Sequence, residues 1–181
     1  MARIDARPLP LDETSVAALA DRGLTYRLVD PTDPEDLRSY STAEARGFLG
    51  AEPTDDEARE FGESIAYRRR IGVYDERGLD PRVPVATVNS WVGELSLPGG
   101  RQTPVWAISG VTVSPTRRRR GIARAMLEGE LRTARDAGLA VAALTVSEAT
   151  IYGRFGFAPA VEVTSWDIAT RRAGWRGGEP S

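Results

Sequence analysis

The stretch from Val111 to Ala123, Val-Thr-Val-Ser-Pro-Thr-Arg-Arg-Arg-Arg-Gly-Ile-Ala, constrains the fold more than any other part of the chain. It is typical of a buried strand, a turn, and a helix whose start carries four arginines and a glycine. The N–H groups at a helix start point outward with the positive end of the helix dipole, and a glycine leaves room for an anion to approach them. The pattern therefore favours a phosphate-binding turn.

An exposed basic helix start is the alternative interpretation of Arg117–Arg120. Four adjacent cations oppose the helix dipole at a cost on the order of tenths of a kcal/mol each, unless an anion compensates them. The helices expected to begin at Asp33 and Thr54 carry acids in their first turns instead. This contrast favours a bound anion. Nucleic acid ranks below a small ligand, because the net charge is -2 and one short patch supplies few phosphate contacts.

Three absent residue types exclude several kinds of chemistry. The 181 residues include no cysteine and no histidine, and all 24 basic residues are arginine. Disulfides, zinc–thiolate sites, cysteine nucleophiles, Ser-His-Asp triads and histidine metal sites are therefore excluded. Schiff-base lysines and the lysine of a P-loop are excluded as well. We expect no metal site, and proton transfer is left to Asp, Glu, Tyr, a chain terminus or water.

Length and composition predict one soluble domain with short appendages. We expect an N-terminal arm over residues 1–22, one domain over residues 23–170 and a flexible tail over residues 171–181. Apolar residues make up 41% of the chain and charged residues 28%, an ordinary soluble balance. No run approaches the ~20 apolar residues of a membrane helix, and the N-terminus lacks the apolar segment of a signal peptide. A cytoplasmic location is the default expectation.

The order of elements predicts an α/β (α+β) fold with a mixed sheet. Helices come early, three strands joined by turns form an antiparallel meander, and strands then alternate with helices. The expected elements are a helix at Thr14–Asp21, a strand at Leu24–Val29, helices from Asp33 and Thr54, strands at Arg70–Tyr74, Pro84–Leu95 and Thr103–Val113, a helix from Ile122 to Gly138, a strand at Val141–Thr145, a helix at Ser147–Phe155 and strand structure in Phe157–Asp167. The helix from Asp33 is expected to bury Leu37, Tyr40, Ala45 and Phe48.

Two segments carry a family resemblance. Arg118-x-x-Gly121-x-Ala123, after the strand Val111–Val113, resembles the acetyl-CoA signature of the GNAT superfamily of N-acyltransferases. The segment Val141–Phe157, taken with Val111–Gly121, resembles the N-terminal domain of the Eis-type aminoglycoside and lysine N-acetyltransferases. The match is strong over residues 105–160, whereas the first hundred residues match only in element order. It implies a mostly antiparallel twisted sheet flanked by helices, with acetyl-CoA at a splayed central strand.

The resemblance also implies roles for individual residues. Val111 and Val113 would pair their backbone with the pantetheine arm, and Ser147 would lie beside its end. Tyr152 would be the general acid that protonates the departing CoA thiolate. A phenol with a pKa near ~10 suits this role, since the thiol lies near ~8.5. Without the resemblance, a core aromatic would be the better interpretation of Tyr152. The pyrophosphate would be held by Arg118, Arg119, Arg120, Gly121, Ile122 and Ala123.

The sequence departs from the Eis type in three respects. That type uses its own C-terminal carboxylate as the base, whereas this chain ends soon after Trp175, so it is either a short relative or the first domain of a longer protein. Glu94 or a water is then left as the base. Gly110 stands where an aromatic is often found, and Arg117 replaces a common histidine. These departures make the identity of the acceptor uncertain, whereas the expected cofactor is unaffected.

The resulting prediction is an acetyl-CoA-dependent N-acetyltransferase that acts on a primary amine of an aminoglycoside, a polyamine or a lysine-like group by direct attack. A non-catalytic GNAT-fold module that binds acyl-CoA is the alternative. We expect no nucleic-acid or membrane partner. The sequence is compatible with a homo-oligomer but does not determine the oligomeric state. Trp91 and Trp106 either line an acceptor cleft or belong to the core or its rim. The acids Asp55–Glu57 either attract a cationic acceptor or simply begin a helix.

Overall fold

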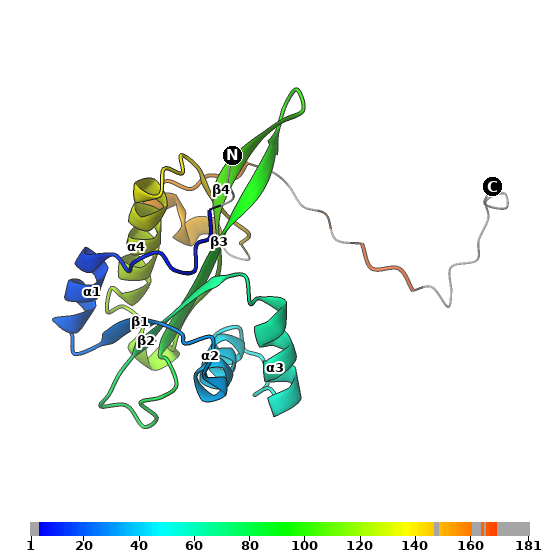
Figure 1. Cartoon of the computed structure of the whole chain (residues 1–181). Coiled ribbons are helices and arrows are strands. Elements are labelled where there is room, and N and C mark those ends of the chain that lie inside the picture. The colour runs from blue at the N-terminus through cyan, green and yellow to red at the C-terminus, as the bar shows by residue number, and fades with distance from the viewer. Residues whose placement is uncertain (1–3, 147–148, 161–163, 165, 170–181) are drawn as a thin grey trace. The chain divides into compact units, whose positions relative to one another are not determined.

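The computed structural model describes residues 4–146, 149–160, 164 and 166–169. The chain divides into two compact units, Met1–Ser147 and Glu148–Ser181, and the range 23–170 expected for one domain spans both. The first unit contains the whole sheet and the four α-helices (Figure 1). Every helix in the described part of the chain is too short or too polar to cross a membrane.

The sheet has five strands in the order β1-β2-β3-β4-β5. The first four form an antiparallel meander, and β5 pairs with β4 in the parallel direction. This arrangement confirms the predicted mixed and mostly antiparallel sheet. The strands are β1 (Thr25–Leu28), β2 (Arg69–Tyr74), β3 (Ala86–Leu97), β4 (Arg101–Val113) and β5 (Ala142–Leu144).

Helices α2 (Pro34–Gly47) and α3 (Asp55–Ser64) cover one face of the sheet (Figure 1). The predicted caps are confirmed, since the Asp33 side chain accepts from the N–H of Glu35 and Thr54 forms a capping box with Glu57. Tyr40 is buried as expected. Phe48 is not, because α2 ends at Gly47 and the ring is 60% exposed beyond the last turn.

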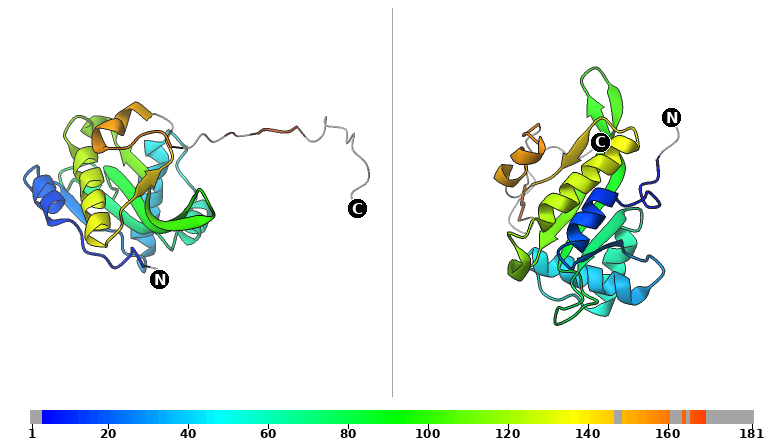
Figure 2. Two further views of the ribbon diagram at one scale, coloured as in Figure 1. Left: turned by 90° about the horizontal axis from the view of Figure 1, so that it is seen from above. Right: turned by 90° about the vertical axis from the view of Figure 1, so that its left-hand side faces the viewer.

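Helices α1 (Glu13–Ala20) and α4 (Ile122–Asp136) cover the opposite face, where they lie side by side (Figure 2). Leu19 is fully buried, and the Ser15 hydroxyl donates to the carbonyl of Ala125 at 2.6 Å. Arg132 on α4 holds Asp12 through two hydrogen bonds of 2.8 and 2.9 Å. The picture of residues 1–22 as an arm is therefore corrected, because α1 contributes to the core.

A buried ion pair joins β2 to α4. The Nε of Arg69 lies 3.4 Å from Oε1 of Glu130, and both side chains are at most 1% exposed. Arg69 also donates to the carbonyls of Leu9 and Pro10, and the Ser90 hydroxyl donates to Glu130. Burial raises the pKa of Glu130, and Arg69 and Ser90 oppose this effect. The pair thus ties the N-terminal segment, the sheet and α4 together.

A β-bulge interrupts β4 at the point where α2 approaches the sheet. Thr87 pairs with Thr112 and Asn89 pairs with Ser109, so Gly110 and Val111 together oppose a single residue of β3. Gly110 has a left-handed φ of 60°. A Cβ atom there would lie 2.3 Å from Nδ2 of Asn89 and 2.8 Å from Oε1 of Glu44. Only glycine therefore fits the point where α2 approaches β4.

Residues after β5 differ from the prediction. The helix expected over Ser147–Phe155 is replaced, within the described residues, by two short 3₁₀ helices, η2 (Ala149–Ile151) and η3 (Gly153–Phe155). Gly156, with a φ of 88°, ends the second of them. Residues 157–160, 164, 166 and 167 form no strand. The predicted cap at Ser147 and the tail after Trp175 lie outside the described residues.

Leu19→Ala should lower the free energy of unfolding by about 3 kcal/mol, because it leaves a cavity between α1 and the rest of the core. Urea denaturation followed by circular dichroism measures this loss. Leu79→Ala is the matched control, since Leu79 is fully exposed and should change stability by less than about 0.5 kcal/mol. Equal and small effects of both substitutions would contradict the packing of α1.

Gly110→Ala should cost about 3 kcal/mol of stability, because it adds an atomic overlap to the strain of a left-handed backbone. Gly99→Ala separates the two causes. Gly99 also has a positive φ, 79°, but no atom of the described residues lies within 4 Å of its Cβ position, so we expect a loss of only about 1 kcal/mol. Thermal and urea unfolding of both variants measure the difference, and equal losses would argue against the close approach of α2.

Candidate active site

The turn between β4 and α4 has the geometry of an anion-binding loop. The 3₁₀ helix η1 (Pro115–Arg117) follows the strand, and Gly121 precedes α4 with a left-handed φ of 73°. No side chain among the described residues caps the start of α4. Arg119 is also left-handed, with a φ of 61°, which is unfavourable for a residue with a side chain. The first N–H groups of α4 have no acceptor within the helix. Such backbone is suited to an anionic ligand.

The four arginines of the turn have different surroundings. The Nε of Arg117 donates to Asp75, the residue after β2, at 2.9 Å, and its Nη2 forms an ion pair with the same carboxylate at 2.7 Å; this contact lowers the pKa of Asp75. The Nε of Arg118 donates to the carbonyl of Val113 at 3.4 Å. Arg119 and Arg120 are exposed and pair with no carboxylate among the described residues. Arg117 is therefore a structural contact, whereas Arg119 and Arg120 are available to a ligand.

Arg22, which the sequence analysis missed, lies beside the same turn. Its Nη2 atom is 3.4 Å from the position that a Cβ on Gly121 would occupy, and its Nη1 donates to the carbonyl of Ala18. Arg22 follows α1 and is separated from Gly121 by about a hundred residues, so no local pattern links the two. Its guanidinium adds positive charge at the start of α4.

The strand that leads into this turn has one open edge. Strand β5 pairs with β4 only from Trp106–Ala142 to Ile108–Leu144, whereas β4 continues to Val113. On this side, the described residues provide no strand partner for Ser109–Val113. Backbone polar groups along this half-buried edge can therefore pair with an extended ligand. Val111 and Val113 lie here, next to the turn, and Ile122 beyond it is 1% exposed and so offers only its backbone.

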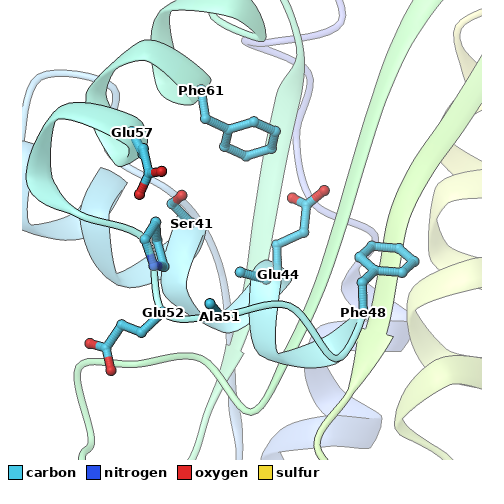
Figure 3. A pocket seen from close by; sticks show the side chains of 9 residues that line it. Ser41, Glu44, Phe48, Ala51, Glu52, Glu57 and Phe61 are labelled. Carbon is cyan, nitrogen blue, oxygen red and sulfur yellow. The ribbon is translucent and has the colours of Figure 1, made fainter. Parts of the chain in front are cut away.

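A pocket of about 410 Å³ lies between α2, α3 and the loop that joins them. In Figure 3 the carboxylate of Glu44 points into the space between the rings of Phe61 and Phe48. Two further carboxylates line the pocket but are engaged, Glu52 in an ion pair with Arg46 and Glu57 in the capping box. Among the described residues, Glu44 pairs with no arginine at ion-pair distance. The pocket therefore combines aromatic walls with one acid that has no arginine partner within the described residues.

Glu44 is held at the sheet by side chains from β3 and its own helix. The Nδ2 of Asn89 lies 3.4 Å from Oε2 of Glu44 and 3.3 Å from the Tyr40 hydroxyl. Arg68 donates to Oδ1 of Asn89 at 3.1 Å. Burial raises the pKa of Glu44, with Tyr40, Arg68, Asn89 and Arg70 acting in the opposite direction. Glu44 follows Tyr40 by four residues, so the helical spacing that buried Tyr40 was an available signal.

The tryptophans and acids that the sequence offered for the acceptor side lie in different surroundings. Trp106 is fully buried and belongs to the core, whereas Trp91 is partly exposed and stacks 4.1 Å from the guanidinium of Arg68. Glu94 is exposed on β3, five residues beyond Asn89, which is roughly 16 Å along a strand. The acids of α3 are explained by its N-terminus, since Glu57 completes the cap.

The second unit contains Tyr152, the candidate acid. Tyr152 directly precedes η3, is partly exposed, and meets Phe157 edge to face with the ring centroids 6.2 Å apart. Ser147, expected beside the pantetheine, lies outside the described residues.

Comparisons with known proteins identify the family. Residues 29–160 match the family model described as an acetyltransferase (GNAT) domain. An uncharacterized N-acetyltransferase of Streptomyces griseus is 35% identical over 163 residues, 87% of this chain and 37% of that protein. N-acetyltransferase Eis of Mycobacterium bovis BCG is 42% identical over 86 residues, 48% of this chain and 21% of that protein.

A solved structure agrees with the fold. A predicted acetyltransferase of Clostridium acetobutylicum, solved with acetyl-CoA, superposes with a TM-score of 0.61 over 83% of this chain and 99% of that one, at 20% identity. The chain spans about a third of the length of the Streptomyces griseus relative. The family match covers most of the chain, and with it the open edge of β4 and the arginine–glycine turn. The chain therefore belongs to the GNAT acetyltransferase family.

Proposed function

We propose that this protein is an acetyl-CoA-dependent N-acetyltransferase. The observation that carries the proposal is the open edge of β4 at Ser109–Val113, which leads directly into the uncapped start of α4. An extended pantetheine arm would pair with Val111 and Val113, and the pyrophosphate would follow at the turn. The acetyl-CoA present with the Clostridium acetobutylicum protein supports this choice of co-substrate.

The turn would hold the pyrophosphate through backbone and side chains together. The N–H groups from Arg119 to Ala123 would donate to its oxygens, and Ile122 would contribute through its N–H alone. Arg118, Arg119 and Arg120 would neutralise its charge, since arginine forms strong charge-assisted hydrogen bonds with phosphate. The positive charge that opposes the α4 dipole would then be compensated by the ligand.

Direct transfer accounts for the chemistry without a covalent enzyme intermediate. The acceptor nitrogen attacks the thioester carbonyl, whose oxygen is polarised by a backbone N–H, and the C–S bond breaks. Tyr152 would protonate the departing thiolate, and Ser147 would lie beside the end of the pantetheine. A phenol is protonated at neutral pH and can donate to a thiolate whose conjugate acid has a pKa near ~8.5.

The acceptor would be a primary amine of an aminoglycoside, a polyamine or a lysine-like group. The similarity to Eis, named an N-acetyltransferase, supports transfer to nitrogen. A module that binds acyl-CoA without turnover is the competing function. Release of free thiol from acetyl-CoA in the presence of spermidine, kanamycin or an N-α-acetyllysine ester tests the enzyme against the module.

Arg119→Ala and Arg120→Ala should each weaken acetyl-CoA binding about tenfold, because each removes a charge-assisted contact with the pyrophosphate. Isothermal calorimetry measures the affinity. Arg101→Ala is the control, since Arg101 is an exposed arginine in the β3–β4 hairpin. Binding of S-acetyl-pantetheine, which lacks the diphosphate, should be unchanged in all three variants. Wild-type affinity in both turn variants would place the diphosphate elsewhere.

Tyr152→Phe should lower kcat about 100-fold and leave the dissociation constant of acetyl-CoA within about twofold, because only the proton donor is lost. The deficit should narrow as the pH rises above ~8.5, where the thiolate is a stable leaving group without a proton. Thiol release measured from pH 6 to 10 checks both statements. Full turnover by the phenylalanine variant would show that another group is the acid.

A further inference from the structure

We propose that the carboxylate of Glu44 binds the ammonium group of the acceptor in the pocket between α2 and α3, and receives the proton that this nitrogen loses before it attacks. The inference rests on the proposed acetyltransferase function and deepens it. It assigns an acceptor-side base, and a chemical class of acceptor, to residues of this chain.

The position of Glu44 relative to β4 is the first argument. A pantetheine arm that begins at the turn and pairs with Val113 and then Val111 brings its thioester toward Gly110. Oε1 of Glu44 lies 2.8 Å from the Cβ position of Gly110, and a Cβ on Gly47 would lie 2.3 Å from Cβ of Thr112. The last turns of α2 are thus pressed against the same end of β4. This contact places the Glu44 carboxylate beside the end of β4 that the thioester would reach.

The bonding of Glu44 is the second argument. It accepts from Asn89, and its other close polar contact is with Tyr40. No arginine completes an ion pair with it in the described part of the chain. A half-buried carboxylate without a cationic partner is unfavourable unless a ligand supplies one. Its side chain points into the pocket, where an ammonium group would provide that missing charge (Figure 3).

The walls of the pocket indicate the class of acceptor. Phe48 and Phe61 flank the carboxylate, and 60% of Phe48 is exposed although it is a large apolar side chain. Aromatic rings bind both apolar groups and the CH₂ groups next to an ammonium. A volume of about 410 Å³ is within the range of small-molecule sites. We infer a primary amine carried on an apolar or ring-bearing body.

The proton balance of the step is complete. The acceptor enters as an ammonium ion and gives one proton to Glu44, so its nitrogen lone pair is released. The N–C bond forms, the C–S bond breaks, and nothing is oxidised or reduced. As the amide forms, the nitrogen loses a second proton, and this proton restores the Tyr152 phenol, which has given its own to the thiolate. Glu44 then releases its proton to water, and one proton leaves per turnover.

The charged surroundings of Glu44 set the expected pH dependence. Tyr40 faces Glu44 from α2. Arg70 in β2 and Arg68, the residue before β2, act on it from the sheet, and Glu52 and Glu57 line the same pocket. Burial raises its pKa above that of an ordinary glutamate, and the two arginines limit the shift. A base acts only when ionised, so kcat/KM should fall as the pH drops through this raised pKa.

Glu44→Gln, Glu44→Asp and Glu60→Gln form the test set. Glu60 is an exposed glutamate of α3 with no part in the pocket. Thiol release is measured with phenethylamine, spermidine and kanamycin from pH 4.5 to 9. Calorimetry measures acetyl-CoA binding, and phenethylamine binding in the presence of CoA. Thermal unfolding confirms that each variant is folded.

We expect Glu44→Gln to lower kcat/KM for the best amine about 100-fold, weaken phenethylamine binding at least tenfold, and remove the acidic limb of the pH profile. Glu44→Asp should keep the limb with a reduced rate. Acetyl-CoA affinity and the Glu60→Gln profile should match wild type. If Glu44→Gln does not fold, Glu44→Asp decides the assignment. A reduced rate with the acidic limb kept supports it, and a rate equal to that of wild type overturns it.

Two different results separate this inference from the proposed function. If wild type turns over an amine and Glu44→Gln keeps kcat/KM within threefold and the same acidic limb, the assignment of Glu44 is wrong. If wild type binds acetyl-CoA and acetylates none of the amines, the enzyme function fails. The amine-binding assay then decides the Glu44 site alone, because equal phenethylamine affinity in wild type and Glu44→Gln would overturn it.

Discussion

The glycine bulge in β4 is the constraint on which the arrangement of the site depends. Two residues of β4 oppose one of β3, and the first of them, Gly110, is left-handed and carries no side chain. A bulge increases the local twist of a strand, and the missing Cβ admits Glu44 from above. The bulge lies within Ser109–Val113, the segment of β4 for which the described residues provide no partner on the β5 side. One backbone irregularity thus brings a helix carboxylate next to the open strand edge.

The buried ion pair on the face of the sheet covered by α1 and α4 helps to position the turn at Gly121. Burial of Arg69 and Glu130 costs desolvation energy, which is offset only when the remaining polar atoms are also paired. Ser90 and the carbonyls of Leu9 and Pro10 provide these partners. Since Glu130 belongs to α4, the same network holds the helix whose first turn begins at Gly121. Residues before α1 therefore help to position a turn that follows them by over a hundred residues.

Features encoded by neighbouring residues could be predicted from the sequence. The caps at Asp33 and Thr54, the antiparallel meander and the end of α4 near Gly138 each depend on a few adjacent residues. The burial of Leu19 could not be predicted, because it depends on the packing of α1 against distant elements, α4 among them. The burial of Phe48 was wrongly predicted, because the helical spacing of apolar residues continues in the sequence past Gly47, where α2 ends. Arg22 and Glu44 were missed for a related reason, since each is brought to its place only by tertiary contacts.

Charge is distributed unevenly between the two ends of the proposed site, and this asymmetry argues for two different ligands. Arg119 and Arg120 lie at the start of α4, where they oppose the helix dipole and pair with no carboxylate of the described residues. Glu44 lies near Gly110 and has no ion-pair partner in the part of the chain that the structure describes, so both positions are unfavourable without a ligand. Their charges have opposite signs, and three strand residues separate Gly110 from the end of β4. An anion at one end and a cation at the other relieve both costs, and a ligand that relieves such a cost adds its binding energy to the folded state.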